Sequence, residues 1–248
     1  MCARYRLGAV QPLIPEGARC STCGGVVDRF GHHYFACPGA ALIRRHDRLV
    51  VQAAAMCRAC TGSVVHIEVT GMFRRERHGQ ASGQRCQKRA DIVLEASGTM
   101  DPGPGQRGRA PLGGGSGLQV ADMAVSSPHA PAYVTAAQRP GGCAELREGC
   151  KASAHEAEVR AAGHTFVPVV FETHGALGPR GTAWFRALVQ QASVVGQDPD
   201  RPPSPEEEQW LRAQLAFEWQ QRLSVTLQRG NARAIITRSR RSRDGMGV

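Results

Sequence analysis

Cysteine and histidine residues that could bind one metal ion lie close together near the start of the chain, and this cluster constrains the fold more than any other feature of the sequence. Two cysteines separated by two residues place their thiols on one tight turn, and Gly24 and Gly25 let that turn fold back beneath a metal ion. A third cysteine and one of two adjacent histidines complete a tetrahedral set that suits zinc, and the sequence leaves the choice of histidine open. The candidate ligands of this CCHC zinc knuckle, predicted over residues 19–40, are Cys20, Cys23, His32, His33 and Cys37.

The chain contains nine cysteines, which raises the alternative of a secreted protein held together by disulfides. However, the N-terminal sequence has no apolar signal core, and no later stretch approaches the roughly 18 apolar residues of a membrane span. We therefore expect a reducing compartment, nuclear or otherwise intracellular, and no secretion. Free cysteines in a small core remain the alternative to zinc binding. Cys57 and Cys60, three residues apart on an expected helix, are interpreted as a buried structural pair.

The formal net charge is +10 and the sequence pI is about 9.6, and most of the positive charge is arginine. The planar guanidinium group of arginine suits phosphate, so this balance favours a nucleic-acid partner. Acidic proteins and membrane surfaces also attract basic chains, and charge alone does not exclude them. We expect DNA as the partner, with RNA as the alternative, and no membrane association.

Short β-branched runs alternate with longer helical patterns along the rest of the chain. Strands are predicted at residues 64–69, 91–96, 118–125 and 165–172, and Pro168 argues for either an edge position or a bulge in the last strand. Helices are predicted at residues 41–60, 143–162, 181–195 and 205–230, the last with Ser204 as its N-cap. The expected fold class is α/β, a small mixed sheet flanked by helices, with the zinc knuckle at its N-terminal end.

Composition divides the chain further. Residues 1–18 are expected to form an irregular lead, and residues 41–196 the core that follows the knuckle. Within the core, residues 98–117 are so rich in glycine and proline that we predict a disordered insert. Residues 237–248 are predicted to form a mobile basic tail.

Acidic residues on neighbouring predicted strands suggest a second kind of metal chemistry. Asp91 begins one strand and Asp122 lies in the next, which we expect to return antiparallel beside it. Glu68 on the first strand and Lys151 on the following helix are positioned to join them. Carboxylates hold Mg²⁺, the metal activates water, and a lysine positions water or stabilises developing charge in phosphodiester hydrolysis. Taken singly, each aspartate here is better explained as a turn or strand-edge residue.

A pattern of segments across residues 20–235 resembles the C-terminal zinc-knuckle and restriction-like endonuclease region of non-LTR retrotransposon reverse transcriptase polyproteins. The knuckle sequence CSTCGGVVDRFGHHYFAC is followed by RRHDRL, by KRADI around Asp91 and by VADMAV around Asp122. Lys151, FVP running into ETHG at residues 172–175, and the late WQQRLSVTLQRGNA at residues 219–232 complete the pattern.

The resemblance implies a PD-(D/E)XK nuclease fold in which Asp91 is the first motif aspartate, Asp122 the second acid and Glu68 a supporting acid. The lysine that normally follows the second acid by two residues is replaced by Ala124, so Lys151 is interpreted as a lysine supplied from the neighbouring helix. Ala90 stands where a proline usually precedes the first aspartate. Two further residues that recur in the pattern are His46 and Glu172, and Glu172 is equally suited to capping the turn that follows it.

The leading hypothesis is a retrotransposon-derived, Mg²⁺-dependent DNA endonuclease domain that nicks target DNA, with Zn²⁺ as a structural ion. The alternative is a catalytically inactive remnant that acts as a zinc-stabilised nucleic-acid-binding module. A third possibility is a structural zinc protein that binds another protein. In the first two cases the knuckle and the following helix contact phosphate, and the predicted nucleic-acid-binding residues are Arg44, Arg45, His46 and Arg48.

Overall fold

A computed structural model describes residues 9–70, 89–95, 117–194 and 201–244 of the chain, with side chains described as far as residue 240. The helices are α2 (His33–Ala36), α3 (Ala40–Thr61), α4 (Gly142–Ala161), α5 (Pro179–Gln191) and α6 (Pro205–Asp244). The strands are β1 (Val65–Thr70), β2 (Arg89–Leu94), β3 (Gln119–Ser126) and β4 (Thr165–Glu172). Two short 3₁₀ helices, η1 (Pro131–Tyr133) and η2 (Ala136–Gln138), lie between β3 and α4.

The strands form one four-stranded sheet in the order β1-β2-β3-β4. β1, β2 and β3 pair antiparallel, whereas β4 pairs with β3 in parallel after the crossover through α4. β4 is an edge strand, which is one of the two arrangements predicted from Pro168, because a proline cannot donate a hydrogen bond to a second neighbouring strand. The predicted α/β class and mixed sheet flanked by helices are confirmed.

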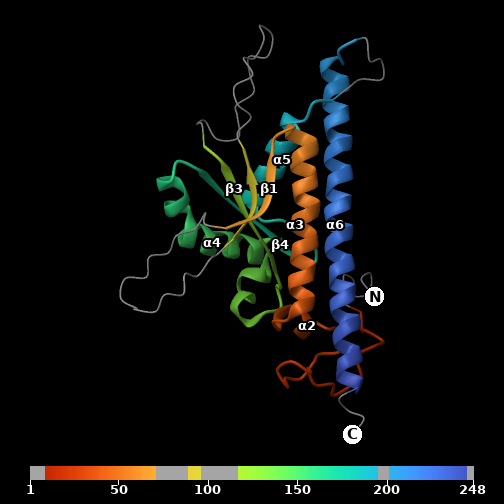
Figure 1. The fold of residues 1–248 in the computed structure, drawn as a ribbon. Helices are drawn as coiled ribbons and strands as arrows, with labels where there is room; N and C mark the ends of the chain where they lie inside the picture. The colour runs from red at the N-terminus through yellow and green to blue at the C-terminus, as the bar shows by residue number, and fades with distance from the viewer. Residues whose placement is uncertain (1–8, 71–88, 96–116, 195–200, 245–248) are drawn as a thin grey trace.

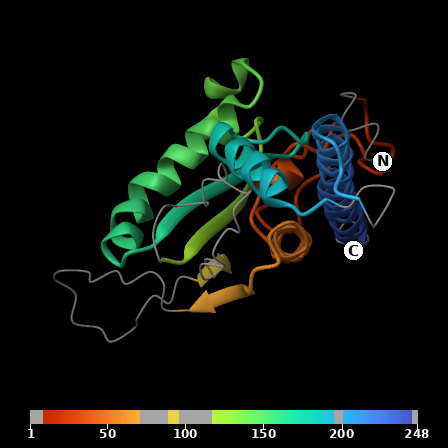
Figure 2. The same cartoon turned by 90° about the horizontal axis from the view of Figure 1, so that it is seen from above.

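Helices cover both faces of the sheet (Figure 2). Side chains of α3, α5 and α6 share one core with Ile92, Met123 and Val169 of the sheet. On the other face, Val159 of α4 packs in a smaller core with Phe166. Apolar side chains of β3 and β4 therefore pack against helices on both faces, as expected for a sheet buried on both sides.

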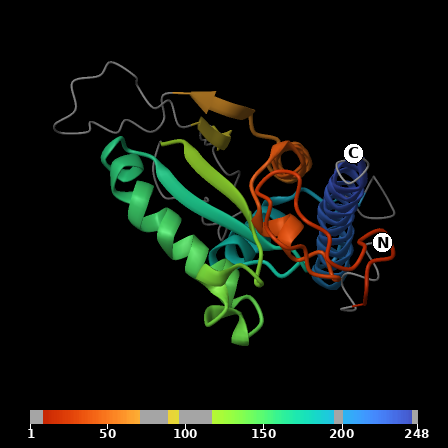
Figure 3. The same ribbon diagram turned by 90° about the horizontal axis from the view of Figure 1, so that it is seen from below.

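Helices α3 and α6 lie side by side over the length of α3 (Figure 1), and both are seen end-on in Figure 3. They run in opposite directions, so that the start of α3 and the end of α6 both lie beside α2. Gly230 permits the close approach, because a Cβ atom at this position would lie 2.5 Å from Cγ of Arg45 and 3.3 Å from its Cα. None of the helices in the described ranges is both long and apolar enough to span a bilayer.

The C-terminal helix corrects two sequence predictions. α6 continues to Asp244 rather than ending near residue 230, so residues 237–244 are helical and are not a mobile tail. The helix persists because Ala234 and Ile235 are fully buried against the knuckle, and tertiary packing of this kind stabilises a helix beyond its local propensity. Residues 245–248 lie outside the described residues.

Two further segment predictions have different outcomes. Apart from Gly117, the predicted disordered insert at residues 98–117 lies outside the described residues. The described part of the lead contains no helix or strand, but it is not detached, because Ile14 and Ala18 are buried in the core that contains Cys20 and Cys37.

Candidate metal centre and candidate active site

The knuckle brings four ligand atoms together, one from each of Cys20, Cys23, His33 and Cys37, all within 4.8 Å of one another. The Sγ atoms of Cys20 and Cys37 are 3.8 Å apart, and Sγ of Cys23 lies 3.3 Å from Nε2 of His33. Tetrahedral zinc, with Zn–S near 2.3 Å and Zn–N near 2.05 Å, requires separations of about 3.8 Å between sulfurs and about 3.5 Å between sulfur and nitrogen. The four side chains fit a zinc ion.

The two glycines of the turn act as predicted. Gly24 has φ of 70° and donates its N–H to the carbonyl of Cys20, while the N–H of Cys20 donates to the carbonyl of Gly25. A Cβ atom at Gly25 would lie 3.2 Å from Cε1 of His33 and 3.3 Å from Sγ of Cys23. A side chain at Gly25 would therefore press on two of the candidate ligands.

The structure separates the roles of the two histidines. The Asp28 carboxylate accepts the backbone N–H groups of Phe30, His32 and His33, which fixes the start of α2 and directs His33 to the cluster. His32 turns away, with Nδ1 3.2 Å from Oδ1 of Asp28 and its ring stacked on that of His129, centroids 3.5 Å apart. His33 is thus the candidate ligand, and His32 belongs to the seam between the knuckle and the loop after β3.

Electrostatics in the knuckle favour a bound cation. Burial raises the pKa of the Cys20 thiol, but hydrogen bonds from the backbone N–H groups of Thr22 and Cys23, and then from His33 and Cys37, lower it to about 6. Burial and the neighbouring thiols raise the pKa of Cys37 to about 11, against the opposing charge of Arg238. Without a metal only one of this pair would readily ionise, whereas a divalent cation stabilises both thiolates.

Arg238 contacts the knuckle from another part of the chain, and the sequence did not single it out. It lies on α6, is only 4% exposed, and donates from Nη2 to the carbonyl oxygen of Cys37 over 2.8 Å. The signal was its helical phase, because positions 234, 235 and 238 fall on one face once the helix is extended through them. α6 therefore contributes both apolar packing and a charge to the candidate metal centre.

The predicted catalytic acids lie on adjacent strands, just past the point where the ladder between β2 and β3 ends. The antiparallel ladder ends at Ile92 and Ala121, and continuing its register by one step sets Asp91 opposite Asp122. Beyond the end of the ladder, the backbone N–H of Met123 on β3 donates to Oδ2 of the Asp91 side chain on β2. The two aspartates occupy neighbouring positions on adjacent strands, as the sequence predicts.

His46 of α3 is held against the same end of the strands. Its Nε2 lies 3.2 Å from Oδ2 of Asp91 and 3.3 Å from the carbonyl oxygen of Met123, while Nδ1 faces Oδ1 of Asp47 at 3.3 Å. Burial lowers the pKa of His46, but hydrogen bonding and charge from Asp91, then Asp47, raise it to about 9. Both ring nitrogens face acceptors, so the imidazolium is the form that the site stabilises.

Asp122 and Lys151 form a buried ion pair. Nζ of Lys151 on α4 lies 2.7 Å from Oδ2 of Asp122, and the two side chains are 9% and 4% exposed. The sequence predicts that these two residues belong to one site, and in the structure they are in direct contact. An ammonium group beside a carboxylate in a site with little water is suited to stabilising negative charge.

Glu68 lies at the position across from Asp91 in the register of β1 and β2. Its φ of 54° lies in the left-handed region, and its carboxylate pairs with Arg89 at 3.0 Å on an exposed part of β1 and β2. Among the described residues, the knuckle is the one place where three or more metal-binding side chains gather with ligand atoms within 4.8 Å. The backbone thus places Glu68 beside Asp91, while its carboxylate is engaged by Arg89.

The predicted basic face of α3 needs a correction. Arg44 and Arg48 are exposed, but Arg45 is only 3% exposed and its Nη1 donates to Oδ1 of Asn231 on α6 at 2.9 Å. Asn231 in turn donates to the carbonyl of Thr173. Arg45 therefore joins α3, α6 and the turn after β4, and it does not face a nucleic acid.

Other candidate residues have structural roles. Oε1 of Glu172 accepts the N–H of Ala144 in the first turn of α4 at 3.2 Å, so this carboxylate caps a helix. Glu148, which the sequence did not single out, likewise accepts the N–H groups of Arg180 and Gly181 at the start of α5. Cys57 and Cys60 are buried in the main core, as predicted.

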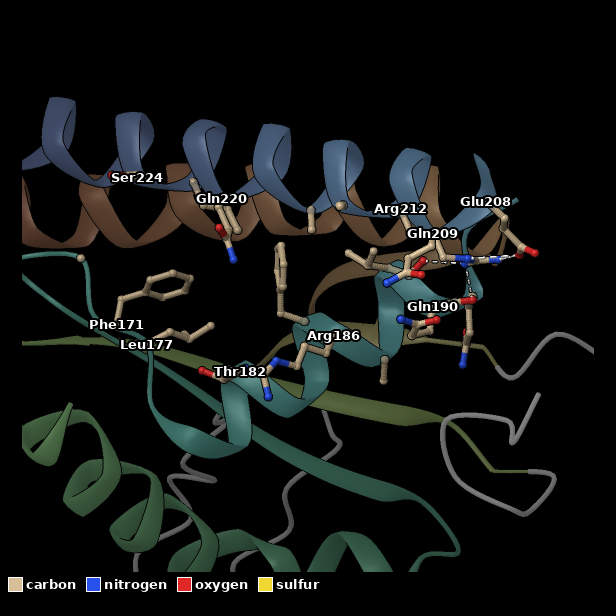
Figure 4. A pocket seen from close by; sticks show the side chains of 18 of the residues that line it. Phe171, Leu177, Thr182, Arg186, Gln190, Glu208, Gln209, Arg212, Gln220 and Ser224 are labelled. Atoms are coloured by element: carbon tan, nitrogen blue, oxygen red, sulfur yellow. Dashed lines mark hydrogen bonds and ion pairs between the residues drawn. The ribbon is translucent and has the colours of Figure 1, made fainter. Parts of the chain in front are cut away.

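A groove of about 1170 Å³ lies between α5 and α6, away from both sites (Figure 4). Its walls include Phe171, Leu177 and Leu223, with polar side chains around them. Arg212 closes one end by donating to the carbonyl oxygens of Val189 and Ala192 at the C-terminal end of α5. None of the predicted site residues lines the groove.

No protein-family model matches the chain, and no curated protein matches its sequence.

Proposed function

We propose that this chain is a zinc-stabilised, Mg²⁺-dependent DNA endonuclease domain of the restriction-like PD-(D/E)XK type that nicks its target. The observation that carries the proposal is that Asp91 on β2 and Asp122 on β3 each lie one residue beyond the last pair of their ladder, with Lys151 on α4 in contact with Asp122. The sequence resemblance to the retrotransposon endonuclease region assigns these same three residues to the site.

The donor set is compatible with Mg²⁺, which binds proteins through one or two carboxylates and fills its remaining positions with water and substrate phosphate. Asp91 and Asp122 would hold the ion, which supplies an activated water and polarises the phosphoryl group. Lys151 holds a positive charge at Asp122 Oδ2 and is positioned to stabilise charge on the scissile phosphate. His46 orients Asp91 through its Nε2 hydrogen bond.

The test is nicking of supercoiled plasmid by the full chain with Mg²⁺. We expect the wild type to convert supercoiled to open-circular DNA and Asp91→Asn to lose this activity by at least about 100-fold, as removal of a metal-binding carboxylate predicts. Glu95→Gln is the matched control, because Glu95 is an exposed carboxylate just beyond the other end of β2. Equal nicking by wild type and Asp91→Asn would show that the activity comes from elsewhere.

A second candidate is the catalytically inactive remnant that binds nucleic acid without cleaving it. Two observations favour it: Lys151 already neutralises Asp122, and Glu68 is engaged with Arg89. Duplex binding without nicking in either Mg²⁺ or Mn²⁺ would select this function over the nuclease. In both cases the knuckle stabilises the fold, and neither function requires it to take part in chemistry.

A further inference from the structure

The second half of α6 combines a rigid helix with an unusual charge distribution. From Trp219 to Arg243 the sequence holds seven arginines and no acidic residue. Because the backbone is helical throughout this segment, helical geometry sets the position of each arginine around the helix axis. Four of them, which we call the α6 arginine stripe, are Arg222, Arg229, Arg233 and Arg240.

Helical geometry aligns the stripe. Steps of seven, four and seven residues at about 100° per residue keep all four positions within a sector of about 40°, and the rise of about 1.5 Å per residue spreads them over about 27 Å. All four side chains are exposed. The buried residues Leu227, Asn231 and Arg238 lie about 140–180° away on the helix, so the stripe faces outward from the α3 and knuckle contacts.

The stripe has little charge compensation from the protein. Arg222 pairs with Glu218 and lies over the Trp219 ring, its Cζ 5.0 Å from the centroid. Among the described residues, no carboxylate forms an ion pair with Arg229, Arg233 or Arg240. Interaction with the helix dipole does not account for the pattern, because that effect is confined to about the last turn.

We propose that the α6 arginine stripe is a docking surface for the phosphate backbone of duplex DNA. This proposal rests on the proposed function and adds to it a binding surface separate from the acids at Asp91 and Asp122. A straight array of guanidinium groups about 27 Å long complements a duplex that carries one charge per roughly 1.7 Å of axis. Such contacts fix position and carry no sequence information.

The surroundings of the stripe favour a duplex over other polyanions. Residues 220–240 contain no aromatic side chain, so the bases of a single strand would find no stacking platform there. An acidic membrane would need an apolar face beside the charges, but Ala234 and Ile235 are buried in the knuckle core. In this half of the helix, Val225 is the large hydrophobic residue that is exposed among those described.

The proposal is tested by the salt dependence of binding of the full chain to a labelled 30-base-pair duplex of mixed sequence. The slope of log K against log salt is negative, and each lost phosphate contact reduces its magnitude by about 0.9. The variant Arg229→Gln, Arg233→Gln, Arg240→Gln should therefore reduce the magnitude of the slope by about 2.7. The matched control neutralises three exposed arginines on other elements, Arg147→Gln, Arg186→Gln and Arg201→Gln, and should change it by less than about 1.

Equal slopes for the two triple variants would overturn the docking surface, as would a loss confined to single-stranded DNA of the same length. Zinc content and helical circular dichroism verify that each variant is folded. The lysine variant Arg229→Lys, Arg233→Lys, Arg240→Lys retains the charges and should retain most of the slope. Failure of the nuclease proposal can be told apart from failure of the docking surface. If only the nuclease proposal is wrong, Asp91→Asn has no effect on nicking, but the two triple variants still differ in slope.

Discussion

Among single residues, Asp122 and Lys151 are the pair whose environment differs most from that of an ordinary surface ion pair. Both side chains are almost completely buried, and Nζ lies 2.7 Å from the carboxylate. Breaking such a pair costs more than the pair itself contributes, because one charge stays in a medium that solvates it poorly. The pair therefore serves the structure as well as any chemistry.

Asp122→Ala should lower the free energy of unfolding by about 3 kcal/mol, because the buried Lys151 ammonium loses its carboxylate. Adding Lys151→Met should recover part of this loss, since the charge is then removed. Urea denaturation of both variants measures the effect. Glu95→Ala, which removes an exposed carboxylate paired with His66, serves as the control and should cost less than about 1 kcal/mol. If the double variant is less stable than Asp122→Ala, the buried charge is not the cause.

His46 gives the folded state a pH dependence of known sign. Its pKa of about 9 lies above the unfolded value, so its contribution is complete below about pH 6.5 and is lost as the pH rises through 9. The stability difference between wild type and His46→Gln should fall by about 3 kcal/mol between pH 6 and pH 10. Denaturant titrations at five pH values measure it, and a difference that stays constant or grows over this range contradicts the raised pKa.

At the scale of elements, the contact between α3 and α6 depends on one glycine. A side chain at Gly230 would overlap the Cβ and Cγ of Arg45, which is held in place by Asn231. Overpacking at such a position costs about 1–3 kcal/mol, which exceeds the gain of up to about 1 kcal/mol from replacing a helical glycine by alanine.

Gly230→Ala should therefore lower the free energy of unfolding by about 1 kcal/mol or more. Gly149→Ala is a matched control on α4, because no heavy atom outside its own turn lies within 4 Å of a Cβ built there. That control should raise stability by about 0.5–1 kcal/mol. Thermal and urea unfolding of the two variants give the comparison, and a stabilising Gly230→Ala would show that the helices can move apart without loss.

At the scale of the whole molecule, the two ends of the chain meet at the candidate metal centre. The knuckle lies near the N-terminus, yet its core includes Ala234 and Ile235, and Arg238 binds the carbonyl of Cys37. The same helix packs along α3, which carries His46 to Asp91. Metal binding is thus linked through α6 to the packing beside the candidate active site.

Removing zinc with a chelator should loosen the last part of α6 before it affects the sheet. Without the metal, Cys20 and Cys37 no longer share a cation, and the small core around Ile235 loses its support. Amide hydrogen exchange should rise at least tenfold in residues 231–240, with little change in α4. Uniform exchange throughout the chain, or unchanged protection of α6, would contradict this coupling.

Sequence patterns alone determined most of the secondary structure. Period-two and period-3.6 patterns are local, so the strand at Thr165–Glu172 matches its prediction and the helix over Ala40–Thr61 differs from its prediction by one residue at each end. The knuckle was likewise predictable, because its ligands lie within one short segment. Local chemistry also predicted the edge position of Pro168, with a bulge as the alternative, and the N-cap Ser204, whose Oγ accepts the N–H of Glu207.

Only the tertiary structure decided which of those residues face each other. Arg45 and Arg238 look like solvated charges in sequence, but each is buried because a distant segment supplies an acceptor, Asn231 for one and Cys37 for the other. The full length of α6, the choice of His33 over His32 and the pairing of Glu68 with Arg89 were decided in the same way. Each of these depends on contacts between residues far apart in the chain or on side-chain direction, which periodicity and spacing do not encode.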